Sequence, residues 1–98
     1  MSWFVYLARC ADGSLYCGIA RDVQARIAEH DAGKGARYTR GRGPLRVVLV
    51  RRCREQGTAL RIEYAIKQLA RGEKERLAAQ PERVAAIARA ALRAARRA

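Results

Sequence analysis

Two short apolar runs separated by turn residues open the chain. Residues 3–8 (WFVYLA) form an aromatic and β-branched run, and residues 15–19 (LYCGI) form a second one. Residues 11–14 (ADGS) have turn chemistry, since Asp and Gly tolerate positive φ. The pattern predicts a β-hairpin in which Tyr6 and Tyr16 lie near each other if the register brings them together.

Helical spacing of apolar residues dominates the rest of the chain. The predicted elements are a helix at residues 23–32 with Asp22 as N-cap, a loop at 33–44, a well-buried third strand at 45–50, a helix at 59–71 closed by Gly72, a short helix near 73–79 and a tail helix opened by Pro81. A chain of 98 residues has room for one core. We therefore expect a compact domain at residues 1–79 and a basic amphipathic helix at residues 80–98.

The net charge points to a polyanionic partner. Lys and Arg number 21 against 9 Asp and Glu, which gives a formal charge of +12. Nucleic acid is the first candidate and an anionic membrane the second. The alternative is solubility in an arginine-biased composition, since 18 of the 21 cations are Arg. No run of 18 apolar residues exists, so no transmembrane helix is expected, and the apolar stretch ending at Ala8 is too short for a signal peptide.

The cysteines do not form a recognisable site. Cys10, Cys17 and Cys53 are odd in number and contain no C-x-x-C pair, so they fit neither a disulfide framework nor a zinc site. We interpret them as reduced, buried core residues, which places the protein in the cytoplasm.

Tyr6 and Tyr16 are candidates for the activation of a water molecule. Hydrolysis of a phosphodiester needs a deprotonated water, and a phenol is a poor base at its ordinary pKa of about 10. Nearby positive charge would have to lower that pKa, and Arg26 and a metal ion are the candidate sources. Without further context, two tyrosines on strands are more often core residues.

Arg26 and His30 lie one helical turn apart in the first predicted helix, on the shoulder between core and solvent. The planar guanidinium of Arg26 suits bidentate binding of phosphate oxygens. The alternative for Arg26 is an ion pair with Asp22, four residues earlier. His30, the only histidine, could relay a proton or hold the attacking water, or be a neutral structural residue.

Glu63 is a candidate metal ligand in the helix predicted at residues 59–71. It would stand nearly alone, which Mg²⁺ tolerates because it keeps several waters and takes further ligands from substrate phosphates. Lys67 follows four residues later, so an ordinary helix ion pair is the alternative.

The loop at residues 33–44 carries four glycines, four cations and no acid. It matches neither the P-loop nor the G-x-G-x-x-G pattern. Its glycines would let backbone N–H groups approach phosphates, and Tyr38 could stack on a base. A merely solvated loop is the alternative. The candidate nucleic-acid-binding residues are Lys34, Arg37, Tyr38, Arg40, Arg42 and Lys67.

The order of these residues resembles the GIY-YIG nuclease domain over about residues 3–78. The stretch GKGARYTRGR at residues 33–42 and EYAIKQL at residues 63–69 resemble its small stand-alone bacterial branch. Phe4 stands where the first motif has glycine, and Cys17 where the second has isoleucine. An asparagine found late in some relatives has no counterpart, because the chain contains no Asn.

The resemblance implies an α+β fold, with a three-stranded antiparallel sheet flanked by helices and followed by a C-terminal helical tail. It implies a nuclease that acts on DNA with one divalent ion, Mg²⁺ or Mn²⁺, and a role in DNA repair. The matching catalytic residues are Tyr6, Tyr16, Arg26, His30 and the metal ligand Glu63, and Gly18 is the tight-packing glycine of the second motif.

Three hypotheses follow for function. The first is a magnesium-dependent DNA endonuclease, with single-stranded or branched forms as candidate substrates. The second is a nucleic-acid-binding module of the same fold without useful turnover. The third, a membrane-surface or protein-interaction helix at residues 81–97, is weaker, because that helix offers mostly alanine on its apolar side. We expect removal of the tail to lower nucleic-acid affinity more than stability.

Overall fold

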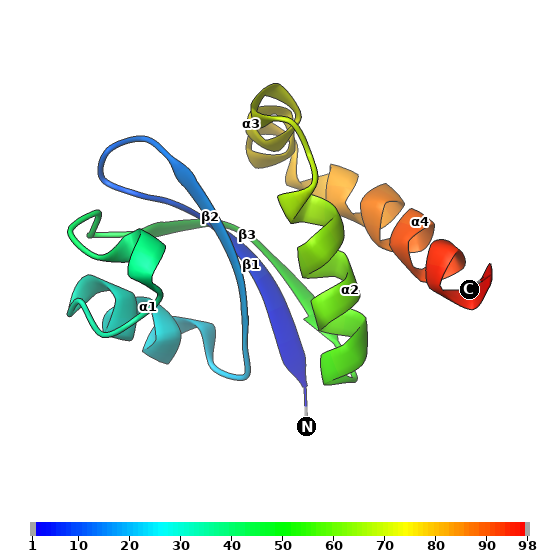
Figure 1. Ribbon diagram of the computed structural model, residues 1–98, viewed down its shortest axis with the longest axis horizontal. Coiled ribbons are helices and arrows are strands. Elements are labelled where there is room, and N and C mark those ends of the chain that lie inside the picture. Colours follow the sequence, from blue (N-terminus) through cyan, green and yellow to red (C-terminus); the bar gives the residue numbers. More distant parts are fainter. Residues whose placement is uncertain (1, 98) are drawn as a thin grey trace.

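The computed structural model describes residues 2–97 of the chain, with side chains described as far as residue 94. It has the predicted α+β fold, a three-stranded antiparallel sheet with helices on both sides (Figure 1). The elements are β1 (Trp3–Arg9), β2 (Leu15–Ala20), α1 (Val23–Asp31), the 3₁₀ turn η1 (Arg37–Thr39), β3 (Arg46–Cys53), α2 (Gln56–Lys67), α3 (Arg71–Ala79), the 3₁₀ turn η2 (Pro81–Arg83) and α4 (Val84–Arg97).

Strand β1 is the centre of the sheet, in the order β2-β1-β3. Its residues alternate between two covered faces, so four consecutive side chains are buried. Val5 and Leu7 belong to the core under α2, whereas Tyr6 and Ala8 belong to a smaller core with residues of α1. Figure 1 shows α1 on one side of the sheet and α2 with α4 on the other.

The antiparallel register between β1 and β2 brings the two tyrosines together. Tyr6 pairs with Gly18, and Ala8 pairs with Tyr16. Tyr6 and Tyr16 are therefore diagonal neighbours on one face of the sheet, where side chains of aromatic size can meet. Their ring centroids are 6.3 Å apart.

Strand β3 is less buried than its apolar sequence predicts. It begins at Arg46 and pairs with β1 alone, at an edge of the sheet, and 48% of Val50 is exposed. The expectation of a well-buried strand at residues 45–50 was wrong in this respect. A continuous apolar run indicates burial, but it does not say which position in the sheet the strand takes.

Helix α1 begins where its cap residue predicts. The Asp22 carboxylate accepts a hydrogen bond from the Ala25 backbone N–H at 3.0 Å. After Asp31 the chain leaves the helix through Gly33, whose φ of +77° favours glycine. The following loop at residues 33–44 (the basic loop) then passes over the buried His30 in the last turn of α1.

The boundary between α2 and α3 differs from the prediction. Helix α2 ends at Lys67, and Gly72 lies in the first turn of α3 rather than closing α2. Ala70 has extended backbone angles and is the break between the two helices. Glycine is tolerated at the start of a helix as well as after its end, so a glycine in the sequence does not show whether a helix begins or ends there.

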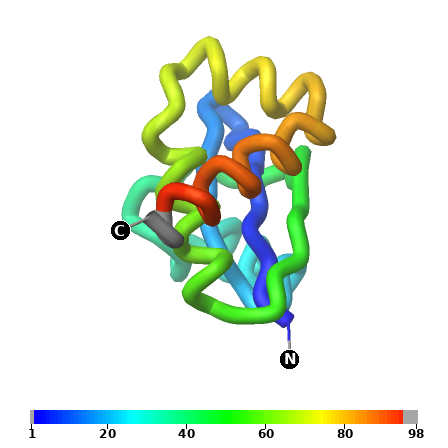
Figure 2. Tube along the Cα trace, turned by 90° about the vertical axis from the view of Figure 1, so that its right-hand side faces the viewer, coloured from blue at the N-terminus to red at the C-terminus, as the bar shows by residue number. Residues whose placement is uncertain are grey.

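Helix α4 packs on the domain as an outer layer. Val84 is 7% exposed and Ala88 1%, and both belong to the core that contains Val5 and Leu77. Figure 2 shows α4 crossing in front of α2 and the sheet. No helix among residues 2–97 combines the length and apolar character that a bilayer span requires.

Deletion of residues 84–98 is expected to destabilise the protein strongly. Burial of Val84 alone is worth about 1.5–3 kcal/mol, so the melting temperature should fall by at least about 6 °C. This reverses the expectation from the sequence, because packing rather than charge dominates the inner face of α4. Thermal unfolding followed by circular dichroism tests it, and an unchanged melting temperature would show that α4 docks only loosely.

Candidate active site

A buried chain of hydrogen bonds links Tyr6, His30 and Thr39. The Tyr6 hydroxyl lies 2.8 Å from His30 Nε2, and His30 Nδ1 lies 2.7 Å from Thr39 Oγ1. Thr39 Oγ1 in turn donates to the Ala36 carbonyl at 2.8 Å. Tyr6 and Thr39 are 0% exposed and His30 is 1% exposed. The chain thus connects β1, the last turn of α1 and the basic loop.

The end of this chain assigns the tautomer of His30. A carbonyl only accepts, so the single Thr39 proton must point at Ala36, and Thr39 Oγ1 must accept from His30 Nδ1–H. Nε2 is then unprotonated and accepts from the Tyr6 hydroxyl. The Ala36 N–H also approaches Nδ1, at 3.4 Å, but that contact is long, and the two shorter bonds decide the assignment.

Burial keeps this histidine neutral. It lowers the pKa of His30 below its ordinary 6.5, and the charge of Arg26 lowers it further. A neutral imidazole suits both bonds, because it offers one donor and one acceptor.

Two glycines make room for the chain. A Cβ on Gly18 would lie 2.6 Å from the Tyr6 hydroxyl oxygen, and a Cβ on Gly35 would lie 2.1 Å from His30 Nδ1. Neither distance is possible without movement of the neighbouring group. Gly18 lets β2 pass over the Tyr6 hydroxyl, and Gly35 lets the basic loop close over the imidazole.

Tyr16 forms the outer layer of the site. Its ring lies 5.0 Å from the His30 ring, edge to face, and 6.0 Å from the Tyr38 ring, nearly parallel. Unlike Tyr6, Tyr16 is only partly buried. It is therefore the tyrosine that can meet a solvent molecule or a substrate.

The tyrosine pKa values move in the direction opposite to the expectation from the sequence. Burial raises the pKa of both Tyr6 and Tyr16 above 10.0, and this outweighs the lowering effect of Arg26 on each. Lys67 also lowers the pKa of Tyr16, whereas Glu63 raises it. Both phenols are thus protonated at neutral pH, because burial disfavours the phenolate form more than the nearby cations favour it.

Arg26 faces the two tyrosines from α1. Its charge acts on the pKa of both phenols, so the guanidinium lies close to the pair. Its ion pair is with Glu29, at 2.7 Å, and not with Asp22, whose carboxylate caps the helix. Its side chain keeps 34% of its exposure, so it remains accessible to a phosphate.

Glu63 and Lys67 approach Tyr16 from α2 on the opposite side. The Lys67 ammonium lies 6.0 Å from the Tyr16 ring and 3.5 Å from the Glu63 carboxylate. The Glu63 side chain is 17% exposed. The ion pair that the sequence offered as an alternative therefore exists, and it lies beside Tyr16.

This donor set fits a magnesium ion better than a transition metal. Among the described residues no three His, Cys, Asp or Glu side chains gather in one place, so a dedicated metal cage is not present there. One carboxylate beside an open face suits Mg²⁺, which uses few protein ligands and takes the rest from water and phosphate. Glu63 is the residue that would hold it, after exchanging Lys67 for the metal.

One cation of the basic loop makes contacts within the protein, and the others are exposed to solvent. Arg42 pairs with Asp12 at 2.5 Å, and its guanidinium lies 4.4 Å from the centre of the Tyr38 ring. Base stacking on Tyr38 would have to displace Arg42 or Tyr16, a cost that the sequence does not reveal. The exposed cations of the loop are Lys34, Arg37 and Arg40.

Sequence reasoning missed Thr39 and Gly35. Both lie in the GKGARYT stretch, which charge alone assigned to phosphate binding. The signal was present as a threonine in an otherwise charged and glycine-rich segment. The cysteine prediction is confirmed, because Cys10, Cys17 and Cys53 are free and buried.

Acid should weaken the fold through His30. A folded-state pKa below 6.5 means that the unfolded chain binds the proton more tightly. The contribution is therefore constant above pH 6.5, and stability is lost as the pH falls below that value. Urea unfolding between pH 8 and pH 5 should show this loss. It should be much smaller in His30→Gln, whereas an equal loss in that variant would assign it to other groups. Asp12 and Glu75, whose pKa values are lowered from 3.8 and 4.5, act only at lower pH.

Gly35→Ala should disrupt the hydrogen-bond chain, because the added Cβ overlaps the imidazole. Overpacking of this kind costs about 1–3 kcal/mol. Gly72→Ala is the matched control. Nothing lies within 4 Å of that position in α3, and alanine should stabilise the helix by about 0.5–1 kcal/mol. Equal behaviour of the two variants in urea unfolding would contradict the close approach at Gly35.

Comparison with known proteins identifies the family of the chain. The family described as the GIY-YIG catalytic domain matches residues 2–76. A UPF0213 protein of Aeromonas hydrophila is 47% identical over 81 residues, which is 83% of this chain and 60% of that protein. One from Nitratidesulfovibrio vulgaris is 50% identical over 66 residues, 67% of this chain and 60% of that protein. The chain thus matches about 60% of the length of these two relatives.

A solved structure is also similar. The solution NMR structure of the UPF0213 protein BH0048 from Bacillus halodurans is 47% identical, with a TM-score of 0.53 over 81% of this chain and 84% of that one. The family match covers both tyrosine motifs, α1, the basic loop and α2. The chain belongs to the GIY-YIG family and carries its catalytic domain at residues 2–76.

Proposed function

We propose that this protein is a divalent-metal-dependent endonuclease that hydrolyses phosphodiester bonds in DNA. The observation that carries the proposal is the meeting of three elements around Tyr16. Arg26 approaches it from α1 and Glu63 with Lys67 from α2, while the Tyr6–His30–Thr39 chain lies beneath it. These groups match the needs of phosphodiester hydrolysis: a phosphate binder, a metal ligand and a proton acceptor.

Arg26 and Lys67 bind the phosphate by exchanging partners. Each cation is held by a carboxylate in the protein alone, Arg26 by Glu29 and Lys67 by Glu63. Both pairs are partly exposed, and such pairs are worth only about 0–1 kcal/mol. A phosphate can therefore take over either cation at small cost. The guanidinium gains two parallel hydrogen bonds in the exchange.

Tyr16 would accept the proton of the attacking water after losing its own proton to solvent, which needs a divalent ion nearby to offset the effect of burial on its pKa. It is the partly exposed member of the tyrosine pair, and Lys67 and Arg26 favour its phenolate form. Tyr6 is fully buried and donates to His30, so it positions the imidazole and the floor of the site rather than meeting the water. A divalent ion held by Glu63 and the substrate phosphate would supply an activated water and neutralise phosphate charge.

A nucleic-acid-binding module without useful turnover is the second candidate. The raised pKa values of Tyr6 and Tyr16 favour it, since protonated phenols are poor bases. Such a module would keep the same cations and bind with the same steep dependence on salt.

Cleavage of labelled DNA in Mg²⁺ distinguishes the two candidates. The wild type should cut, and Glu63→Gln and Arg26→Ala should each lose at least about 100-fold in rate, because each removes a charge that acts at the transition state. Thermal unfolding should show little change for either variant, since both side chains keep some exposure.

Arg52→Ala is the matched control for loss of a cation. Arg52 lies on β3 and bonds to the Ser2 hydroxyl, away from the tyrosines. Its rate should stay within about twofold of the wild type, as expected for a peripheral charge that contacts no reacting group. Equal cutting by all four proteins would point to a contaminant, and tight binding without cutting in any divalent ion would favour the binding module.

A further inference from the structure

A cleft continues from the candidate active site along α3, outside the residues that the family pattern accounts for. One part, a cavity of about 280 Å³, is lined by Tyr16 and Lys67 of the site and by Tyr38. A second part of about 210 Å³ shares Leu15, Tyr38 and Lys74 with the first and reaches the hairpin turn at Ser14. Together they form a slot between η1 and α3.

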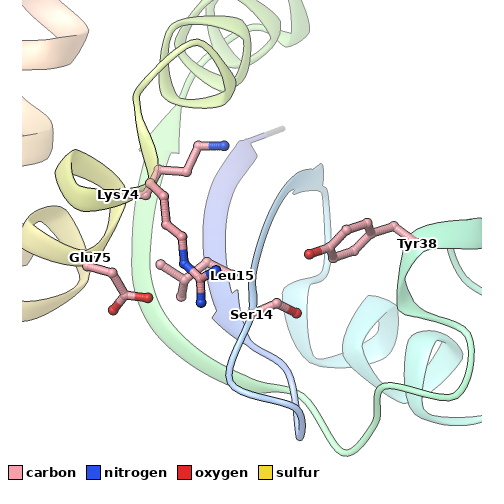
Figure 3. Close-up of a pocket in the computed structure, with 6 residues that line it drawn as sticks. Ser14, Leu15, Tyr38, Lys74 and Glu75 are labelled. Carbon is pink, nitrogen blue, oxygen red and sulfur yellow. The ribbon is translucent and has the colours of Figure 1, made fainter.

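Figure 3 shows how the outer part of the slot is built. Lys74 and Glu75 project from α3 on one side, Tyr38 faces them from η1 on the other, and Ser14 and Leu15 of the hairpin lie between. One wall is thus cationic and helical, and the opposite wall is aromatic.

The cations of this wall outnumber its acids. Arg71 and Lys74 line the slot together with Glu75, and Lys67 joins them at the inner end. The Glu75 carboxylate is held by Arg9 of β1 at 2.7 Å, which neutralises it. The same ion pair ties α3 to the sheet and so holds the wall in place. The slot therefore presents unbalanced positive charge that is continuous with the phosphate-binding residues.

The size of the slot selects for one strand. Each part is smaller than the roughly 300–1,000 Å³ of pockets that take drug-sized ligands. A slot of this size suits the sugar and phosphate of one unpaired nucleotide better than a stacked base pair. The aromatic wall at Tyr38 gives the sugar or base edge an apolar contact, as in single-strand channels.

We propose that this slot is a subsite for an unpaired nucleotide next to the scissile phosphate, with Arg71 and Lys74 contacting the phosphate of the departing strand and Tyr38 its sugar or base. The position relative to the cut rests on the proposed nuclease function. The substrate class is then a nucleic acid that is single-stranded on at least one side of the cleavage point.

The test is fluorescence anisotropy in EDTA, where cleavage does not occur, with a fluorescein-labelled single-stranded DNA of 12 mixed bases. The same sequence as a blunt duplex is the second probe. The variant is the double substitution Arg71→Gln, Lys74→Gln. Its matched control is Arg61→Gln, Arg76→Gln, which removes the same charge. Arg76 lies on the same helix but lines a groove with Leu77 and Ile87, and Arg61 lies on α2 and lines a groove shared with α4.

The slot variant should bind the single strand about tenfold more weakly at 0.1 M salt. Its slope of log affinity against log salt should fall by about 1.4, since each lost contact to a single strand is worth about 0.7. The control variant should bind within about twofold of the wild type, and the duplex should lose less than the single strand in the slot variant. An equal loss in the two variants, or an equal loss for the two probes, would overturn the subsite.

A cleavage assay with Mg²⁺ separates this proposal from the proposed function. If the wild type cuts while the two double variants bind alike, the nuclease stands and the subsite falls. If the wild type does not cut while the binding difference holds, the nuclease falls and the slot remains a strand-binding site without a scissile phosphate.

Discussion

The buried hydrogen-bond chain from Tyr6 through His30 to Thr39 is the interaction on which the site depends. It joins the central strand, the end of α1 and the basic loop through three side chains that are almost completely buried. A buried polar group without a partner costs about 1–3 kcal/mol, so each of the three holds the other two in place. The outer tyrosine, Tyr16, packs against this hydrogen-bond chain, with its ring 5.0 Å from the imidazole. Gly18 and Gly35 are needed because the chain leaves no space for a Cβ at either position.

Ion pairs surround this neutral hydrogen-bond chain. Arg26 with Glu29, and Lys67 with Glu63, flank Tyr16 from opposite helices, and Arg9 with Glu75 anchors α3 beside them. The protein has a formal charge of +12 and only nine acidic residues, and three of those nine form these ion pairs. These ion pairs orient the cations without burying them, so a phosphate can displace the carboxylates at small cost. The slot along α3 continues this arrangement of cations beyond the candidate active site.

The sequence predicted the fold better than the surroundings of the candidate site residues. The hairpin, the Asp22 cap and the α+β arrangement followed from local signals that the structure confirms. The edge position of β3, the break at Ala70 and the packing of Val84 depend on long-range contacts, which no local pattern encodes. The sequence placed Tyr6 and Tyr16 together, but it could not show that burial raises the pKa of both. Thr39 and Arg42 were taken for parts of a phosphate-binding loop, whereas the fold uses one to orient His30 and the other to bind Asp12.

The tautomer of His30 is the most direct test of this arrangement. Long-range ¹H–¹⁵N correlation spectra of the imidazole at pH 7.5 distinguish a protonated Nδ1 from a protonated Nε2. The hydrogen bonds require a proton on Nδ1 and a bare Nε2, and this tautomer should persist as the pH falls to 6.5, because the pKa of His30 is lowered. In Thr39→Val, which keeps the side-chain shape and removes the hydroxyl, the spectrum should shift toward the other tautomer or a mixture. A proton on Nε2 in the wild type, or an imidazolium at pH 7.5, would contradict this hydrogen-bond arrangement.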